Sequence, residues 1–238
     1  MRKQKGNKVI FFASILIVVA IFLIIGAAYS FFTSNDVVRN SLTMGNPDID
    51  LVEPNWNPAN AKNVTPGMVF LKDPILKGIK GDNYGRIVVE FYDLDDDEII
   101  TDLRRINKIK SLIYFDKTYN KNNNPITSTI NPTSNYSLNE LNSFITSGKV
   151  YNFYNKDDFI LDTKRSTDTT FIFNYKRVLH ENDEKVLFSN IAIPINYTNE
   201  DVNLIGNFKI KVYAEAIQSE NIGSMEEAFR ALDGDKSE

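Results

Sequence analysis

Few side chains in this sequence could take part in acid, base or nucleophilic chemistry. The 238 residues include one histidine, His180, and no cysteine. A Ser-His-Asp triad could formally be built on His180, but no G-x-S-x-G motif accompanies it, and a lone histidine cannot supply the HExxH pair of a zinc protease. The sequence favours a solvated turn residue at position 180, and we expect that the protein is not an enzyme.

Carboxylates alternate along one stretch of the chain, at Asp93, Asp95 and Asp97. Hard cations such as calcium take several oxygen ligands, so these three residues are a weak calcium candidate. The EF-hand pattern fails, because its turn glycine would fall at Glu98 and its final glutamate at Arg104. A solvated acidic loop is the favoured interpretation, and we expect no metal and no cofactor. The sequence contains no phosphate-binding loop and no dinucleotide-binding fingerprint.

The elements that would carry these residues are mostly strands. Apolar residues recur at every second position around Phe171, Phe173 and Tyr175, and again in residues 208–214. We predict strands at residues 41–52, 64–71, 86–92, 111–115, 149–154, 169–179, 185–193 and 207–217. Eight strands with few helices predict an all-β fold, specifically a jelly-roll-type β-sandwich.

Helix signals are scarce. Ser137 with Glu140 forms a capping box, and Ser224 with Glu227 has the same spacing, so both predict short helices. Residues 117–136 are rich in Asn, Thr and Pro, which predicts a surface excursion.

The N-terminal region is typical of an export signal. The first thirty residues contain four basic side chains and no acidic one, and residues 9–28 are apolar apart from one serine. Small residues at Ala28 and Ser30 predict cleavage before Phe31. An apolar run of this length also reaches across a bilayer, so a retained anchor is the alternative. In both cases the basic flank predicts that the rest of the chain lies outside the cell.

The remaining chain is acidic. Residues 1–30 hold four of the 27 Lys and Arg and none of the 31 Asp and Glu, so the rest carries a net charge of −8. Such a chain repels nucleic acid and anionic membranes, so we expect no nucleic-acid partner and membrane contact only through an uncleaved leader. Without cysteine, no disulfide stabilises the fold.

Three stretches of the sequence carry a family resemblance. They are GAAYSFFT at residues 26–33, LTMGNPDIDL with EPNW at residues 42–51 and 53–56, and AEAIQ with SMEEAF at residues 214–218 and 224–229. In this order they resemble the TasA and camelysin family of exported biofilm-matrix proteins, including the clostridial branch known as BsaA. The first stretch is similar to the junction cut by the SipW-type signal peptidase of that family.

The resemblance implies a jelly roll that polymerises with itself into matrix fibres, alongside other matrix components. The N-terminal segment of one subunit then completes the sheet of the next, which is strand addition to an open edge. Here the donor strand would be residues 31–40, with Phe31, Phe32, Val37 and Val38 as its polymerisation residues. Camelysin has been described as a protease, but the lone histidine here does not support that activity.

These observations predict four parts. They are a signal peptide at residues 1–30, a donor segment at 31–40, a jelly-roll domain at 41–233 and a charged tail at 234–238. The leading hypothesis is a secreted structural subunit of matrix or cell-surface fibres. The alternative is a monomeric surface adhesion or ligand-binding module that uses the 117–136 excursion, and an exported hydrolase is the third hypothesis.

Overall fold

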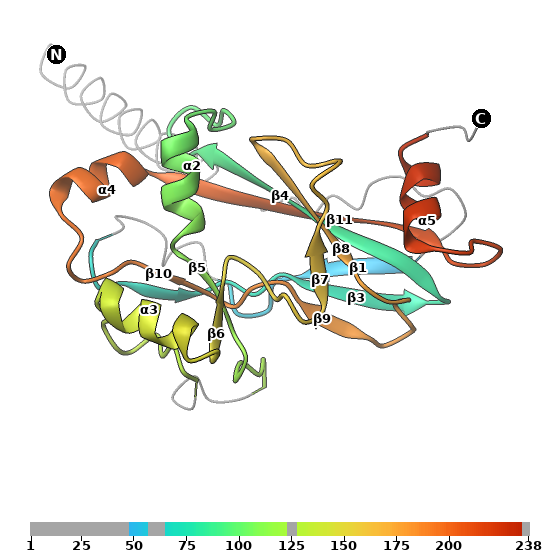
Figure 1. Cartoon of the computed structure of the whole chain (residues 1–238), viewed down its shortest axis with the longest axis horizontal. Helices are drawn as coiled ribbons and strands as arrows, with labels where there is room; N and C mark the ends of the chain where they lie inside the picture. The colour runs from blue at the N-terminus through green and yellow to red at the C-terminus, as the bar shows by residue number, and fades with distance from the viewer. Residues whose placement is uncertain (1–47, 57–64, 123–127, 235–238) are drawn as a thin grey trace, which may run out of the picture. The chain divides into compact units, whose positions relative to one another are not determined.

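The computed structural model describes residues 48–56, 65–122 and 128–234, and Figure 1 shows how their elements are arranged. The chain divides into two units, Met1–Val37 and Val38–Glu238, and every described residue belongs to the second. The predicted signal peptide and donor segment lie outside the described residues. Within the described ranges, no helix combines the length and the apolar character needed to span a bilayer.

The described part is mostly β, as predicted, and forms three antiparallel sheets. Sheet A has the order β1 (Asp48–Val52), β3 (Ile75–Lys80), β9 (Glu184–Val186). Sheet B has the order β2 (Val69–Leu71), β10 (Asn190–Ala192), β5 (Ile113–Asp116), β6 (Val150–Asn152). Sheet C has the order β11 (Phe208–Gln218), β4 (Asn83–Asp93), β8 (Thr170–Tyr175), β7 (Phe159–Leu161). Every pairing within these sheets is antiparallel.

Four short helices connect and cover the sheets in the described ranges. They are α2 (Leu103–Lys110), α3 (Leu138–Thr146), α4 (Asn199–Ile205) and α5 (Met225–Leu232). Ser137 and Ser224 cap α3 and α5 as predicted, because each side chain accepts a hydrogen bond from the backbone N–H three residues later. Helix α2 packs against α4, α3 against β6, and α5 against β11 and β4.

One large apolar core joins all three sheets. It includes Phe91, Phe171 and Phe173 of sheet C, Leu76 of sheet A and Ile191 of sheet B. A second, smaller cluster lies under α3 and contains Leu141, Tyr114, Val150, Ala192 and Ile130. Ile130 comes from the predicted surface excursion, so the end of that excursion is anchored in the interior.

Sheets A and C approach each other closely where β3 turns into β4. A Cβ atom at Gly85 would lie 2.9 Å from Leu76 Cδ2, and one at Gly78 would lie 2.1 Å from the backbone oxygen of His180. Only glycine allows these approaches without a shift of the neighbours. Strand β3 lies against β4, and β1 lies against β11.

Several predicted elements need correction. The segment predicted as one strand at residues 185–193 is two strands, β9 and β10, which belong to different sheets. Strands β3 and β7 and helices α2 and α4 were not predicted. The strand predicted at residues 169–179 ends at Tyr175, and β1 is described only from Asp48.

Candidate assembly edge

The edge strands of the three sheets differ greatly in length. Strands β9, β2, β6 and β7 have three residues each, and β1 has five with a register shift between Asp48 and Ile49. Strand β11 has eleven residues and pairs with β4 without interruption from Phe208 to Gln218. Among the described residues, β11 has a strand neighbour on one side only. It is therefore the longest and most regular edge in the described part of the chain.

The hydrogen bonds at both ends of β11 show which backbone groups face away from β4. Leu94 N–H donates to the Asn207 oxygen at 3.2 Å, and Ser219 N–H donates to the Asp82 oxygen at 2.9 Å. In an antiparallel pair the bonded positions alternate, so the odd-numbered residues of β11 bond to β4. The N–H and C=O groups of the even-numbered residues, from Phe208 to Gln218, point away from β4.

The side chains of the same even-numbered residues face the core. Ile210, Val212, Ala214 and Ala216 are all buried. Ala214 and Ala216 are small, and Ala216 pairs with Gly85 on β4. A strand added beside this half of β11 would therefore meet little side-chain bulk from β11 itself.

The opposite face of β11 is charged near its beginning. Lys209 Nζ lies 2.7 Å from Asp97 Oδ1, and this hydrogen bond lowers the pKa of Asp97. Lys211 Nζ lies 3.4 Å from the centre of the Tyr92 ring. Charged side chains on an exposed sheet face keep that face in solvent, so the edge itself is the more suitable surface for another strand.

Helix α5 covers the other end of this face through a cluster of ion pairs. Arg86 Nε lies 2.6 Å from Glu215 and its Nη2 lies 2.7 Å from Asp233 at the end of α5. Burial lowers the pKa of Arg86, but the hydrogen bond to Asp233 and the charge of Glu215 outweigh it and raise the pKa. Phe229 of α5 is fully buried beside Arg86. The helix thus fixes the end of β11 against β4.

The loop before β11 is also held firmly. Arg105 on α2 donates to the backbone oxygens of Ile205 and Asn207 at 2.9 and 2.8 Å. Its Nη1 also lies 2.5 Å from Asp93 Oδ2, and this hydrogen bond lowers the pKa of Asp93. Arg105 therefore fixes where β11 begins relative to the end of β4.

Strand β1, which lies against β11, leaves its sheet through a buried polar cluster. Lys72, only 1% exposed, pairs with Glu53 at 2.8 Å and lies 4.2 Å from the centre of the Trp56 ring. The carboxylate of Asp73 accepts hydrogen bonds from the Asn55 backbone and side chain at 3.1 and 2.9 Å. These bonds fix the turn after β1, and thereby the position at which this edge strand ends.

The structure separates the three residues of the calcium candidate. Asp93 turns to Arg105, Asp97 turns to Lys209, and Asp95 accepts a weak hydrogen bond from Asn207 at 3.3 Å. In the described ranges, no three His, Cys, Asp or Glu residues are grouped so that they could hold a metal ion.

His180 lies in an exposed turn and faces Asp82. Its Nδ1 is 2.7 Å from Asp82 Oδ1, and both the hydrogen bond and the charge of that carboxylate raise the pKa of His180. No hydrogen bond joins its other ring nitrogen to a serine within the part of the chain that the structure describes. The His180–Asp82 pair could not be predicted from the sequence, because the two residues are far apart in the chain.

The cleavage residues Ala28, Ser30 and Phe31 and the donor residues Phe31, Phe32, Val37 and Val38 lie outside the described residues. No family model, curated protein or solved structure matches this chain.

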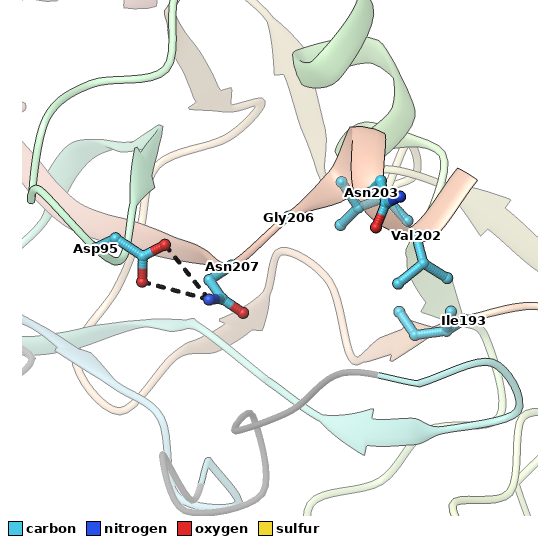
Figure 2. A pocket seen from close by; sticks show the side chains of 7 residues that line it. Asp95, Ile193, Val202, Asn203, Gly206 and Asn207 are labelled. Carbon is cyan, nitrogen blue, oxygen red and sulfur yellow. Dashed lines mark hydrogen bonds between the residues drawn. The ribbon is translucent and has the colours of Figure 1, made fainter. Parts of the chain in front are cut away.

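A pocket of about 300 Å³ opens beside the start of β11 (Figure 2). Its apolar lining comes from Ile193, Val202 and Ile205, and Figure 2 shows Asp95 hydrogen-bonded to Asn207 at one end. Among the described residues that line the pocket, Asp95 is the one titratable side chain.

Proposed function

We propose that this chain is an exported subunit of extracellular fibres, in which residues 31–40 of one copy add as a strand to the β11 edge of the next. The observation that carries the proposal is the edge itself. Eleven consecutive residues stay in register with β4, and β11 is the last strand of sheet C among the described residues, although β1 of sheet A lies against it. Natural proteins usually shorten, bulge or cover such an edge, so a long regular one indicates a binding role.

The proposed donor matches this edge in length and chemistry. Residues 31–40 number one fewer than β11 and contain Phe32 and Val38, which face the same side of an extended strand because they are six residues apart. On the core side they would lie beside Ala214 and Ala216, the small residues of β11. The backbone would supply affinity, and these side chains would set the register.

Two further parts of the proposal are the cleavage that exposes the donor segment and the jelly-roll form of the fold. Removal of residues 1–30 before Phe31 would free the donor segment, and a SipW-type peptidase is the proposed enzyme for that step. The jelly-roll form of the fold is also proposed, and the antiparallel pairing of strands far apart in sequence, such as β2 with β10, supports it. Sequencing of the N-terminus of the secreted protein tests the processing step.

The sharpest test of assembly is Val212→Pro. Proline removes the outward N–H of residue 212 without removing a bond to β4, and proline is accepted on the free side of an edge strand. We expect this variant to stay monomeric in light scattering and to form no filaments in electron micrographs. Val212→Thr, which keeps the N–H, should assemble like the parent protein.

A second proline variant makes the test specific to β11. The Asp162 N–H bonds to the Ile172 oxygen, so the N–H of Leu161 points away from β8 at the opposite edge of sheet C. Leu161→Pro should therefore leave assembly intact. Filaments from Val212→Pro, or equal loss of filaments in both proline variants, would overturn the proposal.

A binding measurement covers the case in which Val212→Pro folds poorly. A chain shortened to begin at residue 41 should bind the ten-residue peptide of residues 31–40 at a ratio of one to one, as measured by calorimetry. A scrambled peptide of the same composition is the control. Equal binding of both peptides would contradict strand addition.

A further inference from the structure

The paired strands β5 and β6 of sheet B, which are joined through residues 117–149 and helix α3, carry an aromatic pair beside a lysine pair. Phe115 pairs with Tyr151, and their rings lie 6.4 Å apart at an angle of 20°. The next pair on the same face is Lys117 with Lys149, because Lys117 N–H bonds to the Lys149 oxygen. Two aromatic and two cationic side chains therefore form one surface at the end of this strand pair.

A third lysine extends the surface. Lys117 Nζ lies 4.0 Å from the centre of the Tyr151 ring, and Lys156 Nζ lies 6.0 Å from the same ring. Lys156 is also 5.9 Å from the ring of Tyr154. The three lysines are exposed and the three aromatic rings are half-buried, so both kinds of group are accessible from solvent. We call Phe115, Lys117, Lys149, Tyr151, Tyr154 and Lys156 the hairpin patch.

The charges of the hairpin patch are poorly neutralised. Within the described ranges, none of its three lysines forms an ion pair with a carboxylate. The nearby Asp157 carboxylate accepts a hydrogen bond from the Tyr151 hydroxyl at 2.6 Å. The hydrogen bond to Tyr151 and the nearby charge of Asp157 raise the pKa of Lys117, so its ammonium is charged beside the aromatic ring and can contact an anion.

This concentration of positive charge contrasts with the rest of the chain, which is acidic outside the first thirty residues. A long polyanion such as DNA makes many phosphate contacts along its length and would be repelled by the acidic surroundings. A short anionic ligand that contacts only the hairpin patch would avoid that repulsion. The flat rings favour a ligand that also has an apolar face.

We propose that the hairpin patch binds an acidic glycan built of uronic acid residues. The C–H face of one sugar ring would pack on Tyr151 and Phe115, as apolar faces do on aromatic side chains. The carboxylates of neighbouring sugars would accept charge-assisted hydrogen bonds from Lys117, Lys149 and Lys156. The ammonium of Lys117, which lies over the Tyr151 ring, would move to the sugar carboxylate. This binding is separate from assembly, because the patch belongs to sheet B and the edge to sheet C.

The test uses the full-length protein and a galacturonate hexasaccharide, with titration calorimetry as the readout. Lys117→Gln/Lys149→Gln should weaken binding about tenfold, because two charge-assisted hydrogen bonds to the glycan are lost. Lys80→Gln/Lys164→Gln is the matched control, since it removes the same total charge from two exposed lysines elsewhere. The control should change affinity less than about twofold.

Two further ligands decide the chemical class. The carboxyl-reduced hexasaccharide, which is neutral, should bind far more weakly than the uronate, and high salt should weaken the uronate complex. A single-stranded oligonucleotide should not compete with the uronate. Equal affinity of the two double variants, equal binding of the neutral sugar, or displacement by the oligonucleotide would each overturn the proposal.

Discussion

The two edges of sheet C are built in opposite ways. Strand β11 runs for eleven residues beside β4, whereas β7 at the other edge pairs with β8 over only three residues. Both strands bury apolar side chains in the same core, and both lie beside a long central strand. The two edges differ in length, and therefore in the number of regularly spaced backbone groups that another strand could bind.

The chain ends β7 by turning away from the edge at Asp162. The Asp162 side chain accepts hydrogen bonds from the backbones of Lys164 and Arg165 and pairs with the Arg165 guanidinium at 2.9 Å. Burial raises the pKa of Asp162, but bonds from Asn174 and Arg165 outweigh it and lower the pKa. A short edge closed by a charged turn resists strand addition. On the proposed function, sheet C would therefore extend in one direction, beyond β11.

The largest expected effect is at Phe159, which anchors the short edge. Phe159 is 1% exposed and its ring lies 5.8 Å from that of Tyr175. Phe159→Ala should lower the free energy of unfolding by about 3 to 5 kcal/mol, because it leaves a cavity in a packed core. Urea unfolding measures the change.

The neighbouring Ile160 is the control for this prediction. It is 46% exposed on the same strand, so Ile160→Ala should change the free energy of unfolding by less than about 0.5 kcal/mol. If Phe159→Ala were as mild as the control, β7 would not be anchored by its single aromatic residue, and the contrast between the two edges would need another cause.

The contrast between the edges also explains which elements the sequence revealed. The alternation in residues 208–214 predicted β11, because a half-buried strand repeats every second residue. The spacing of Phe171, Phe173 and Tyr175 predicted β8, although the structure buries both faces of that strand. Strand β7 is too short for that signal. In β3 the side-chain pattern is interrupted by Gly78. A glycine is needed at that position because the backbone of His180 passes too close for a Cβ atom.

The candidate edge could be predicted only in part. The family resemblance predicted a donor segment, which lies outside the described residues. No sequence pattern, however, shows that a strand will have one neighbour instead of two. That property depends on pairings between distant residues, such as Phe208 with Asp93. Likewise, the break between β9 and β10 falls at two apolar residues, Leu187 and Phe188, which are both fully buried and so look like the middle of a strand.

A smaller effect is expected at Arg86, which secures the β11 side of the sheet. Arg86→Met keeps the apolar stem and removes the pairs with Glu215 and Asp233. We expect a loss of about 2 kcal/mol, below the value typical of fully buried pairs, because both carboxylates keep some contact with solvent. Urea unfolding gives the loss, and limited proteolysis should show faster cleavage at α5.

Arg104→Met is the control for this prediction, since Arg104 is 84% exposed and its pair with Asp102 is long at 3.6 Å. It should leave both readouts nearly unchanged. If Arg86→Met left α5 as protected as in the parent protein, the helix would be held by Phe229 packing alone.

The smallest expected effect concerns pH and the turn beyond the end of β11. The backbone oxygen of Asp82 accepts hydrogen bonds from Ser219, just after the end of β11. The carboxylate of Asp82 pairs with His180, so this pair stabilises the turn at which β11 ends. Because Asp82 raises the pKa of His180 in the folded state, the pair stabilises the protein fully below the unfolded pKa of about 6.5. That contribution disappears as pH rises through the higher folded pKa. His180→Gln should remove this part of the pH dependence of the urea midpoint, and Asp82→Asn should remove it equally. An unchanged pH profile in both variants would show that the pair is fully screened by solvent and leaves the β11 end unaffected.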